Sequence, residues 1–278
     1  PAGADESYPL LGKVRPRHAR EIAASPWSVG GETLDRDYAI YANYKGYLGP
    51  LGVKKIRLQA GWAKCEKKPG QYDWAWLDEV VDDALAQGVA PWLETSYGNP
   101  IYEGGGGAGL GGGLPTGDKA LAAWDAWVAA LVGRYRDRVV EWEIWNEPDL
   151  NKKNTAADYA AFYVRTAEII RREQPKARLL ALAIAGIGNT AYVESFLKPL
   201  AEQKKLHLVD QITVHGYPEN PDSSYPTLAK LLKVVRKYDA KIPLRQGENG
   251  APSTKTVGAL SKLKTSETVQ AKWDLRRM

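Results

Sequence analysis

The chain has 278 residues, 44% of them hydrophobic and 26% charged, which is enough apolar material for the buried core of one large domain. Its formal net charge is +5, but the basic residues are scattered among 33 acidic ones, which argues against a nucleic-acid-binding surface. No apolar stretch approaches the ~20 residues that a membrane-spanning helix needs, so we expect a soluble protein with no membrane span.

The first 25 residues contain prolines and charges without periodicity, and they predict an extended arm ahead of a single domain over residues 26–278. The chain opens on Pro1 and not on methionine, which indicates either that a leader was removed or that the chain was trimmed. We expect a secreted or periplasmic protein. Cys65 is the only cysteine, so an internal disulfide bond is excluded and a packed thiol is expected.

Behind the arm, short apolar runs alternate with segments of helical periodicity. Asp73 is suited to cap the helix after the second strand, and Thr155 with Asp158 forms a capping box for the helix after the fourth. The predicted strands are, in chain order, 26–30, 53–62, 90–97, 142–147, 179–185, 211–215 and 243–247. The predicted helices run over 37–48, from the cap at 73 to about 88, across 121–131, onward from 155, and over 192–205, 228–238 and 266–278.

This alternation of strands and helices predicts an α/β fold with a parallel sheet covered by helices. A closed (β/α)8 barrel, or TIM barrel, needs eight strands, and only seven strand-helix units are readable before Met278. A missing strand would expose two sheet edges, which proteins avoid. We therefore expect either that the chain is part of a longer one or that the N-terminal arm covers the gap. An open doubly wound sheet is the alternative.

The most informative stretch is EWEIWNEPD at residues 141–149. A short apolar and aromatic run stopped by Pro148 predicts a buried strand that delivers Glu147 to its C-terminal end, where barrel enzymes carry out their chemistry. A second carboxylate, Glu248, follows the seventh strand between two glycines, which let the backbone bend close to a substrate. Two carboxyl groups about 5–5.5 Å apart are what cleavage of a glycosidic bond with retention requires. The alternatives are a solvated strand end for Glu147 and an acidic turn for Glu248.

The run at 141–149 resembles the acid/base signature of clan A retaining glycoside hydrolases, barrel enzymes in which a Trp-Asn-Glu-Pro at the end of strand 4 carries the proton donor. The resemblance extends from about residue 27 to residue 278. It implies that Glu147 is the acid/base and that Glu248, on strand 7, is the nucleophile. The segment Tyr-Gly-Asn-Pro-Ile-Tyr at 97–102 is similar to bacterial proteins related to glycoside hydrolase family 39.

The same resemblance implies supporting roles around the nucleophile. Arg57 occupies the strand 2 position where this clan carries an arginine, and there it would hold the ionised Glu248 by a charge-assisted hydrogen bond. An ordinary salt bridge in the barrel floor is the alternative. His215 and Tyr217 match a His-x-Tyr arrangement that contacts the nucleophile, and Tyr217 would donate a hydrogen bond to it. A packed, hydrogen-bonded histidine is the alternative for His215.

Asn146 resembles the asparagine that grips the sugar 2-hydroxyl in this clan. Neighbouring residues in a strand point to opposite faces. Asn146 and Glu147 can therefore both point inward only if the strand breaks there, and Pro148 favours such a break.

The loop after the third strand contains the glycine run 104–113, which predicts either a mobile lid or wall over the barrel, or a disordered surface insertion. We expect Asn99 and Tyr102 in this loop, and Trp62 at the end of the second strand, to contact substrate. The composition of 10 Trp and 15 Tyr against 2 Phe also suits sugar surfaces, since such rings stack and hydrogen-bond at once.

Other chemistries have little support in the sequence. Glu94, Glu143 and Asp149 are competing carboxylates near strand ends, but none lies in a comparable motif. The three histidines are far apart and no cysteine pair exists, so no metal site is predicted. The glycine run lacks the Lys-Ser/Thr that would follow it in a phosphate loop.

The sequence therefore predicts a cofactor-free retaining glycosidase that acts on a carbohydrate substrate, a β-linked poly- or oligosaccharide, by endo or exo attack. Two rival hypotheses remain. One is a non-catalytic carbohydrate-binding barrel, and the other is a basic structural protein that binds anionic polymers.

Overall fold

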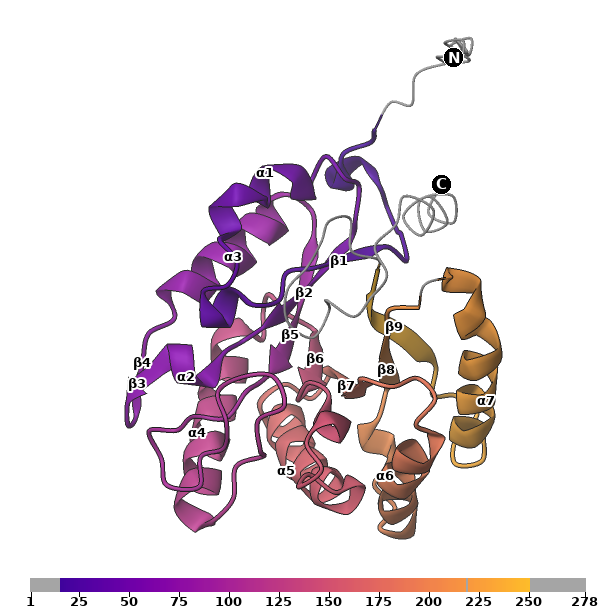
Figure 1. The fold of residues 1–278 in the computed structure, drawn as a ribbon. Helices are drawn as coiled ribbons and strands as arrows, with labels where there is room; N and C mark the ends of the chain where they lie inside the picture. The colour runs from indigo at the N-terminus through magenta and orange to yellow at the C-terminus, as the bar shows by residue number, and fades with distance from the viewer. Residues whose placement is uncertain (1–15, 219, 251–278) are drawn as a thin grey trace, which may run out of the picture.

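A curved sheet of seven parallel strands forms the centre of the molecule, seen in a computed structural model that describes residues 16–218 and 220–250 (Figure 1). The strands are β1 (Ser28–Gly30), β2 (Lys55–Gln59), β5 (Ala90–Thr95), β6 (Glu141–Ile144), β7 (Arg178–Ile184), β8 (Gln211–Gly216) and β9 (Leu244–Asn249). Their order in the sheet is their order in the chain. A doubly wound sheet reverses that order near its middle, whereas a barrel does not. The predicted barrel fold is confirmed, as a nearly closed barrel.

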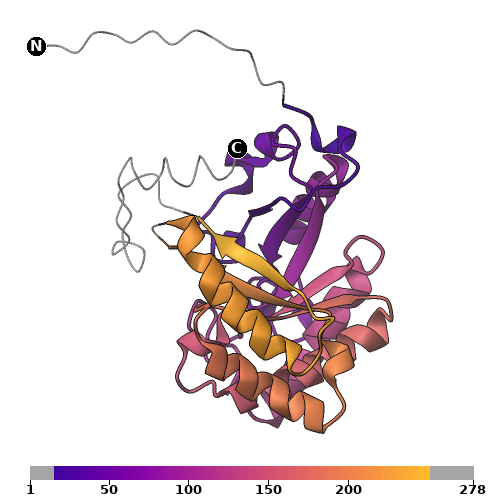
Figure 2. The same ribbon diagram turned by 90° about the vertical axis from the view of Figure 1, so that its right-hand side faces the viewer.

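Helices cover the outer side of the sheet (Figures 1 and 2). They are α3 (Ala75–Ala86), α4 (Asp118–Tyr135), α5 (Ala156–Glu173), α6 (Thr190–Glu202) and α7 (Ser224–Arg236). The predicted cap at Thr155 is confirmed, because its side chain accepts a hydrogen bond from the backbone of Asp158 at 3.1 Å. The predicted cap at Asp73 is wrong by one residue, since Trp74 is the N-cap of α3 and makes no side-chain cap hydrogen bond, although Asp73 accepts a bond from the backbone of Ala75 at 3.0 Å. Within the described part of the chain, none of the helices has the combination of length and apolar character that crossing a membrane requires.

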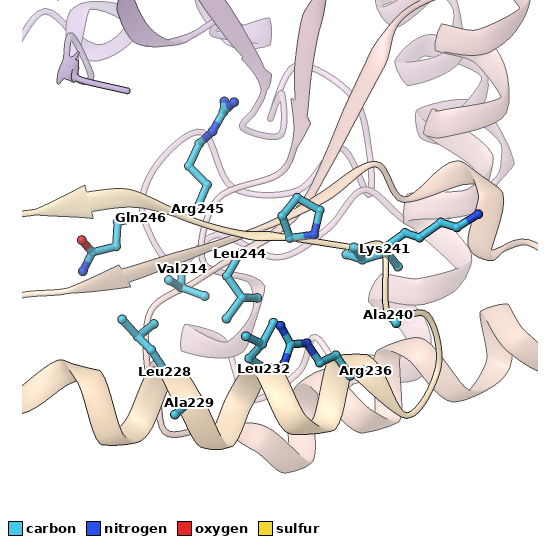
Figure 3. Close-up of a pocket in the computed structure, with 12 residues that line it drawn as sticks. Val214, Leu228, Ala229, Leu232, Arg236, Ala240, Lys241, Leu244, Arg245 and Gln246 are labelled. Atoms are coloured by element: carbon cyan, nitrogen blue, oxygen red, sulfur yellow. The ribbon is translucent and has the colours of Figure 1, made fainter. Parts of the chain in front are cut away.

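The edges of the sheet are β1 and β9, each of which pairs on one side only among the described residues. A pocket of about 550 Å³ lies on the outer side of β9, where α7 packs against it (Figure 3). Leu228 and Leu232 of α7 and Leu244 of β9 are among its lining residues. It lies behind the sheet and is separate from the carboxylates described below. The predicted helix 266–278 falls outside the described residues.

The predicted helix 37–48 is wrong. In its place lie two 3-10 turns, η2 (Leu34–Arg36) and η3 (Tyr41–Asn43), and one helical turn, α1 (Lys45–Leu48). The segment has four tyrosines, one asparagine and Gly46, and these residues favour a helix less than Ala or Leu do. It also lacks a continuous apolar stripe, since Tyr38 is 80% exposed and Tyr47 is 66% exposed.

Two further predictions need correction. The strand predicted over 53–62 ends at Gln59, because Gly61 takes a left-handed conformation (φ 63°) and the chain then forms the short helix α2 (Trp62–Cys65). A small hairpin follows, β3 (Glu66–Lys68) and β4 (Gln71–Tyr72), which the sequence analysis missed although Pro69-Gly70 is a turn signal. The arm is not wholly extended: residues 1–15 lie outside the described part, but Ala19–Glu21 forms the 3-10 turn η1.

Most of the tryptophans belong to the core. Nine of the ten lie in the described part of the chain, and six of those are fully buried: Trp62, Trp92, Trp124, Trp127, Trp142 and Trp145. Several pack on one another near α4, where the ring centroids of Trp124 and Trp127 are 5.1 Å apart. These six rings therefore serve packing between the sheet and its helices, and a role of the aromatic residues at a sugar surface stays a prediction.

Candidate active site

Glu147 reaches the inside of the barrel because the strand that carries it breaks. β6 ends at Ile144, and Trp145 (φ 64°) and Glu147 (φ 48°) both have left-handed backbone conformations. A non-glycine residue in this region costs about 1–2 kcal/mol, so these turns need support from their surroundings. The backbone N–H of Glu147 donates to the carbonyl of Ala183 on β7 at 3.0 Å. Pro148 then begins a 3-10 turn, η4 (Pro148–Leu150). The expected break in the strand is confirmed.

Glu248 lies in β9, directly beside His215 of β8 in the sheet. The pairing shifts by one residue just before this point, because Val214 pairs with Gln246 and His215 with Glu248, which leaves Gly247 as an extra residue. A Cβ atom on Gly247 would lie only 2.9 Å from Nε2 of His215. Glycine is therefore required here by the close approach of the imidazole.

These elements bring Glu147, His215 and Glu248 together. One atom from each of the three side chains, a carboxylate oxygen or an imidazole nitrogen, lies within 4.8 Å of the other two. Nδ1 of His215 is 2.9 Å from Oε1 of Glu147 and 3.5 Å from Oε1 of Glu248. The side chain of Glu147 is 11% exposed and that of Glu248 is 18% exposed, whereas His215 is fully buried. Both carboxyl groups thus retain a route to solvent.

The surroundings of Glu248 favour its ionised form. Its Oε1 accepts a hydrogen bond from Arg57 at 2.6 Å, and its Oε2 accepts one from the hydroxyl of Tyr217, also at 2.6 Å. Burial alone would raise the pKa of Glu248. The charges of His215 and Arg57 and the hydrogen bond from Tyr217 outweigh burial and hold that pKa below its ordinary value.

Arg57 is the centre of a larger charged network. Its guanidinium group, which is fully buried, has five N–H donors. The acceptors are Oε2 of Glu143 at 2.5 Å, Oε1 of Glu248 at 2.6 Å, Oδ1 of Asn146 at 2.8 Å, Oε1 of Glu32 at 3.0 Å and a carboxylate oxygen of Glu94. One guanidinium cannot balance four ionised carboxylates. Some of these groups must therefore hold protons.

The surroundings of Glu94 and Glu32 favour their protonated forms. Burial raises the pKa of Glu94 well above its ordinary value, and the opposing charge of Arg57 does not cancel this effect. Burial also raises the pKa of Glu32, and Arg57 again offsets it only in part. Glu94 and Glu143, which the sequence suggested as competing carboxylates, are fully buried beneath Arg57. Asp149 lies outside the cluster, where it accepts a hydrogen bond from the backbone of Ala185 at 3.0 Å.

Glu32 is a member of the site that the sequence analysis missed. It follows β1 and the pair Gly30-Gly31, and it folds back over the strand so that its carboxylate reaches Arg57. A Cβ atom on Gly30 would lie 2.3 Å from Oε2 of Glu32, and one on Gly31 would lie 2.8 Å from Cδ1 of Ile56. Two glycines before an acidic residue at the end of a strand were the available signal.

Three predicted substrate contacts lie away from this cluster. Trp62 is fully buried and stacks on Tyr102, with ring centroids 5.5 Å apart. The hydroxyl of Tyr102 donates to the carboxylate of Glu66 at 2.6 Å, and the side chain of Asn99 donates to the carbonyl of Glu66 at 2.8 Å. These contacts fasten the glycine-rich loop to β3. Substrate contact by Trp62, Asn99 and Tyr102 stays a prediction, and none of these hydrogen bonds supports it.

In the glycine-rich loop, which contains the run 104–113, backbone segments pack directly against one another. Gly98 donates to the carbonyl of Gly107 at 2.9 Å, and the backbone of Asn99 donates to that of Gly105 at 2.8 Å. A Cβ atom on Gly105 would lie 1.9 Å from the carbonyl oxygen of Asn99. The glycines therefore permit close approach, and they need not imply the mobility that the composition suggested.

The trio of Glu147, His215 and Glu248 is also the one group among the described residues whose ligand atoms are close enough for a metal ion. Both oxygens of Glu248 already accept hydrogen bonds, and the donor at 2.6 Å from Oε1 is a cationic guanidinium. A second cation beside Arg57 would be repelled. The donor set fits proton transfer and nucleophilic attack better than metal binding.

Comparisons with known proteins converge on one kind of fold. The family model described as Glycosyl hydrolases family 39 matches residues 58–239, more than half of the chain. A β-xylosidase of Geobacillus stearothermophilus is 27% identical over 218 residues, which cover 70% of this chain and 38% of that protein. The chain is thus much shorter than that relative.

Solved structures agree. A GH39 β-xylosidase from Caulobacter crescentus has a TM-score of 0.62 at 24% identity, over 82% of this chain and 54% of that one. Xylanase 10B from Thermotoga maritima has a TM-score of 0.59 at 13% identity, over 82% of this chain and 72% of that one. At these identities the likeness shows the barrel fold alone. This chain spans about half the length of the Caulobacter enzyme.

Proposed function

This chain belongs to the glycosyl hydrolases of family 39, and from the geometry of its site we propose that it is a retaining glycosidase acting on β-linked xylosides. In this proposal Glu147 is the acid/base and Glu248 is the nucleophile. The single observation that carries it is the gap between these two side chains, which present oxygens within 4.8 Å of each other in unequal surroundings. Retaining enzymes hold their two carboxyl groups only about 5–5.5 Å apart, whereas inverting enzymes leave about 6.5–9.5 Å for a water molecule.

The first half of the reaction forms a glycosyl-enzyme intermediate. An oxygen of the ionised Glu248 attacks the anomeric carbon, and the bond from that carbon to the leaving oxygen breaks as Glu147 gives this oxygen its proton. The hydrogen bonds from Arg57 and Tyr217 support this role, because they keep Glu248 ionised and fix the direction of its oxygens. Glu147 ends this half as a carboxylate and Glu248 as an ester.

The second half reverses these roles. Glu147 takes a proton from a water molecule, whose oxygen attacks the anomeric carbon from the side that the leaving group vacated. The ester bond breaks, Glu248 regains its charge, and the sugar leaves with its original anomeric configuration. His215, whose Nδ1 is 2.9 Å from Glu147, is placed to orient that carboxyl group through both halves. Asn146, held by Arg57 at 2.8 Å, would bind the sugar 2-hydroxyl beside the reacting carbon.

The choice of a xyloside rests on the relatives. The Geobacillus and Caulobacter proteins are both named β-xylosidases, and the Thermotoga structure with the same fold is named a xylanase. A pentose lacks the exocyclic carbon of a hexose, so it needs less room in a site whose two carboxylates are less than a fifth exposed.

The test uses the intact protein and 4-nitrophenyl β-D-xyloside. We expect hydrolysis in which NMR detects β-xylose as the first product. Glu248→Ala should abolish turnover and Glu147→Gln should slow both halves of the reaction, whereas Glu202→Gln, at the exposed end of α6, should have no effect.

α-Xylose as the first product, or a Glu248→Ala protein that keeps the wild-type rate, would refute the proposal. A protein that binds xylo-oligosaccharides without cleaving them would instead be a carbohydrate-binding barrel. Binding to anionic polymers that falls steeply with salt would indicate the third hypothesis.

A further inference from the structure

Tyr97 lies two residues beyond the end of β5, and its hydroxyl accepts hydrogen bonds from two side-chain amides. Nδ2 of Asn146 donates to it at 2.8 Å, and Nε2 of Gln59 donates to it at 3.2 Å. All three residues are buried, with exposed fractions of 1% for Tyr97, 2% for Asn146 and 3% for Gln59. None of these contacts was part of the sequence-based prediction of the site.

Two arginines fix the direction of both amides. Oδ1 of Asn146 accepts a hydrogen bond from Arg57 at 2.8 Å, and Oε1 of Gln59 accepts one from Arg36 at 2.6 Å. A guanidinium group can only donate, so the oxygen of each amide must face its arginine and the nitrogen must face away. Each amide nitrogen is therefore directed at Tyr97, whose hydroxyl oxygen has two lone pairs to receive them.

The ring of Tyr97 is itself held on two sides. It makes an edge-to-face contact with Trp145, with centroids 5.8 Å apart at an angle of 85°. The guanidinium of Arg36 lies over the ring at 5.0 Å from its centroid. The hydroxyl is thus a fixed acceptor beside Asn146. Burial also raises the pKa of Tyr97, so the phenol keeps its proton throughout the working range of a glycosidase.

We propose that Tyr97 is a positioning residue, which holds the carboxamide of Asn146 in the orientation that binds the sugar 2-hydroxyl. With Oδ1 bonded to Arg57 and one N–H bonded to Tyr97, Asn146 keeps its second N–H and the second lone pair of Oδ1 for the sugar. Without Tyr97, Arg57 alone would hold the amide at one end, and the amide could rotate about that bond. Hydrogen bonds to the 2-hydroxyl strengthen in the transition state, so a loose Asn146 weakens catalysis at that hydroxyl. The inference rests on the proposed function.

The experiment compares two substrates, 4-nitrophenyl β-D-xyloside and its 2-deoxy analogue, which lacks the hydroxyl that Asn146 would bind. The quantity measured is the ratio of kcat/KM for the two substrates. We expect Tyr97→Phe to lower the preference for the 2-hydroxy substrate by about tenfold, the equivalent of one hydrogen bond. Asn146→Ala should lower it at least as far, and the double variant should show little further change because both act on one contact.

Tyr163→Phe is the matched control. Tyr163 is equally buried, and its hydroxyl donates to the carbonyl of Leu208 at 2.8 Å on the outer side of the sheet. The Tyr163→Phe variant should be less stable than the wild-type protein and should keep the same substrate preference. If Tyr97→Phe folds poorly because two amides lose their acceptor, Tyr97→Phe with Gln59→Leu removes one of those unpaired groups and should show the same loss of preference.

A Tyr97 variant that keeps the wild-type preference, whatever its overall rate, would overturn the inference, since a purely structural role lowers activity on both substrates equally. Failure of the proposed function is distinguishable, because it shows without any Tyr97 variant: the wild-type protein hydrolyses neither substrate or releases α-xylose first, or Glu248→Ala keeps the wild-type rate.

Discussion

Replacing Arg57 by methionine should destabilise the protein by about 3–5 kcal/mol at pH 7, the usual effect of removing one partner of a buried ion pair. The structure argues for the upper part of this range. Five acceptors lose their donor at once, and four of them are carboxyl groups. Proton uptake limits how large this loss of stability can become. A carboxyl group without its counterion can take up a proton, which costs about 1.36 kcal/mol for each unit by which the pH exceeds its pKa.

The same reasoning gives the sign of the pH dependence. In the wild-type protein the folded pKa of Glu248 is lowered, so Glu248 contributes stability above its unfolded pKa, and this contribution is lost as the pH falls through the folded pKa. In Arg57→Met, the carboxyls hold protons more readily. The destabilisation should therefore be largest near pH 7 and clearly smaller near pH 5.

Urea unfolding at both pH values measures these differences. The control is Arg165→Met, which removes a surface ion pair with Asp125 and should cost less than about 1 kcal/mol at either pH. Adding Glu143→Gln to Arg57→Met removes one stranded carboxylate and should restore part of the stability, which keeps the test usable if the single variant unfolds at pH 7. A loss below about 1 kcal/mol, or an equal loss at both pH values, would show that Arg57 does not balance this cluster.

Two other predictions concern Glu248 and the glycine-rich loop. Tyr217→Phe removes a hydrogen bond that lowers the pKa of Glu248, so the acid limb of the kcat/KM profile should move to higher pH, while Tyr225→Phe, at a side chain 67% exposed, should leave it in place. Gly105→Ala should lower the melting temperature, because its Cβ would lie 1.9 Å from a carbonyl oxygen and overpacking costs about 1–3 kcal/mol. Gly133→Ala, inside α4 with nothing within 4 Å of the new Cβ, should stabilise by about 0.5–1 kcal/mol.

The strands and long helices could be predicted because each follows from local chemistry. A brief apolar run bounded by glycine or proline is stable as a buried strand of a parallel sheet. Thr155 and Asp158 marked the start of α5 by side-chain capping alone. The segment 37–48 offered no such signal. Its four tyrosines are spaced as if on a helix, but two of them are exposed, and the chain forms separate turns instead.

The charged network could be predicted only in part. The strand ends predicted Glu147 and Glu248 as neighbours, since the C-terminal ends of parallel strands meet at one edge of a barrel. The resemblance to clan A enzymes added Arg57. That Glu32 would join them depends on a backbone that folds back through Gly30, which no periodicity indicates. Tyr97 was hidden for a similar reason, because its partners Gln59 and Asn146 come from two other strand ends.

The glycine-rich loop shows why composition could not decide between mobility and close packing. Glycine serves both, since it lacks the side chain that restricts the backbone and also the side chain that would block a neighbouring chain. The two uses differ only in what lies nearby. A Cβ atom on Gly98 would lie 2.4 Å from the carbonyl oxygen of Gly105, whereas one on Gly111 would meet nothing within 4 Å. Only the first of these positions requires glycine for space.

The distribution of charge around Arg57 bears directly on the proposed chemistry. Glu94 and Glu143 lie fully buried on the inner side of the guanidinium, and Glu32 and Glu248 lie on the side that retains exposure. Burial raises the pKa values of Glu94 and Glu32, which favours their neutral forms, while Glu143 accepts hydrogen bonds from Arg57 at 2.5 Å and from Thr213. The pKa of Glu248 is instead held below its ordinary value, so the carboxyl group whose ionised form is favoured lies on the open side of the cluster. An anomeric carbon that becomes cation-like in the transition state is stabilised by such a charge more than the neutral substrate is, which is the condition for catalysis rather than mere binding.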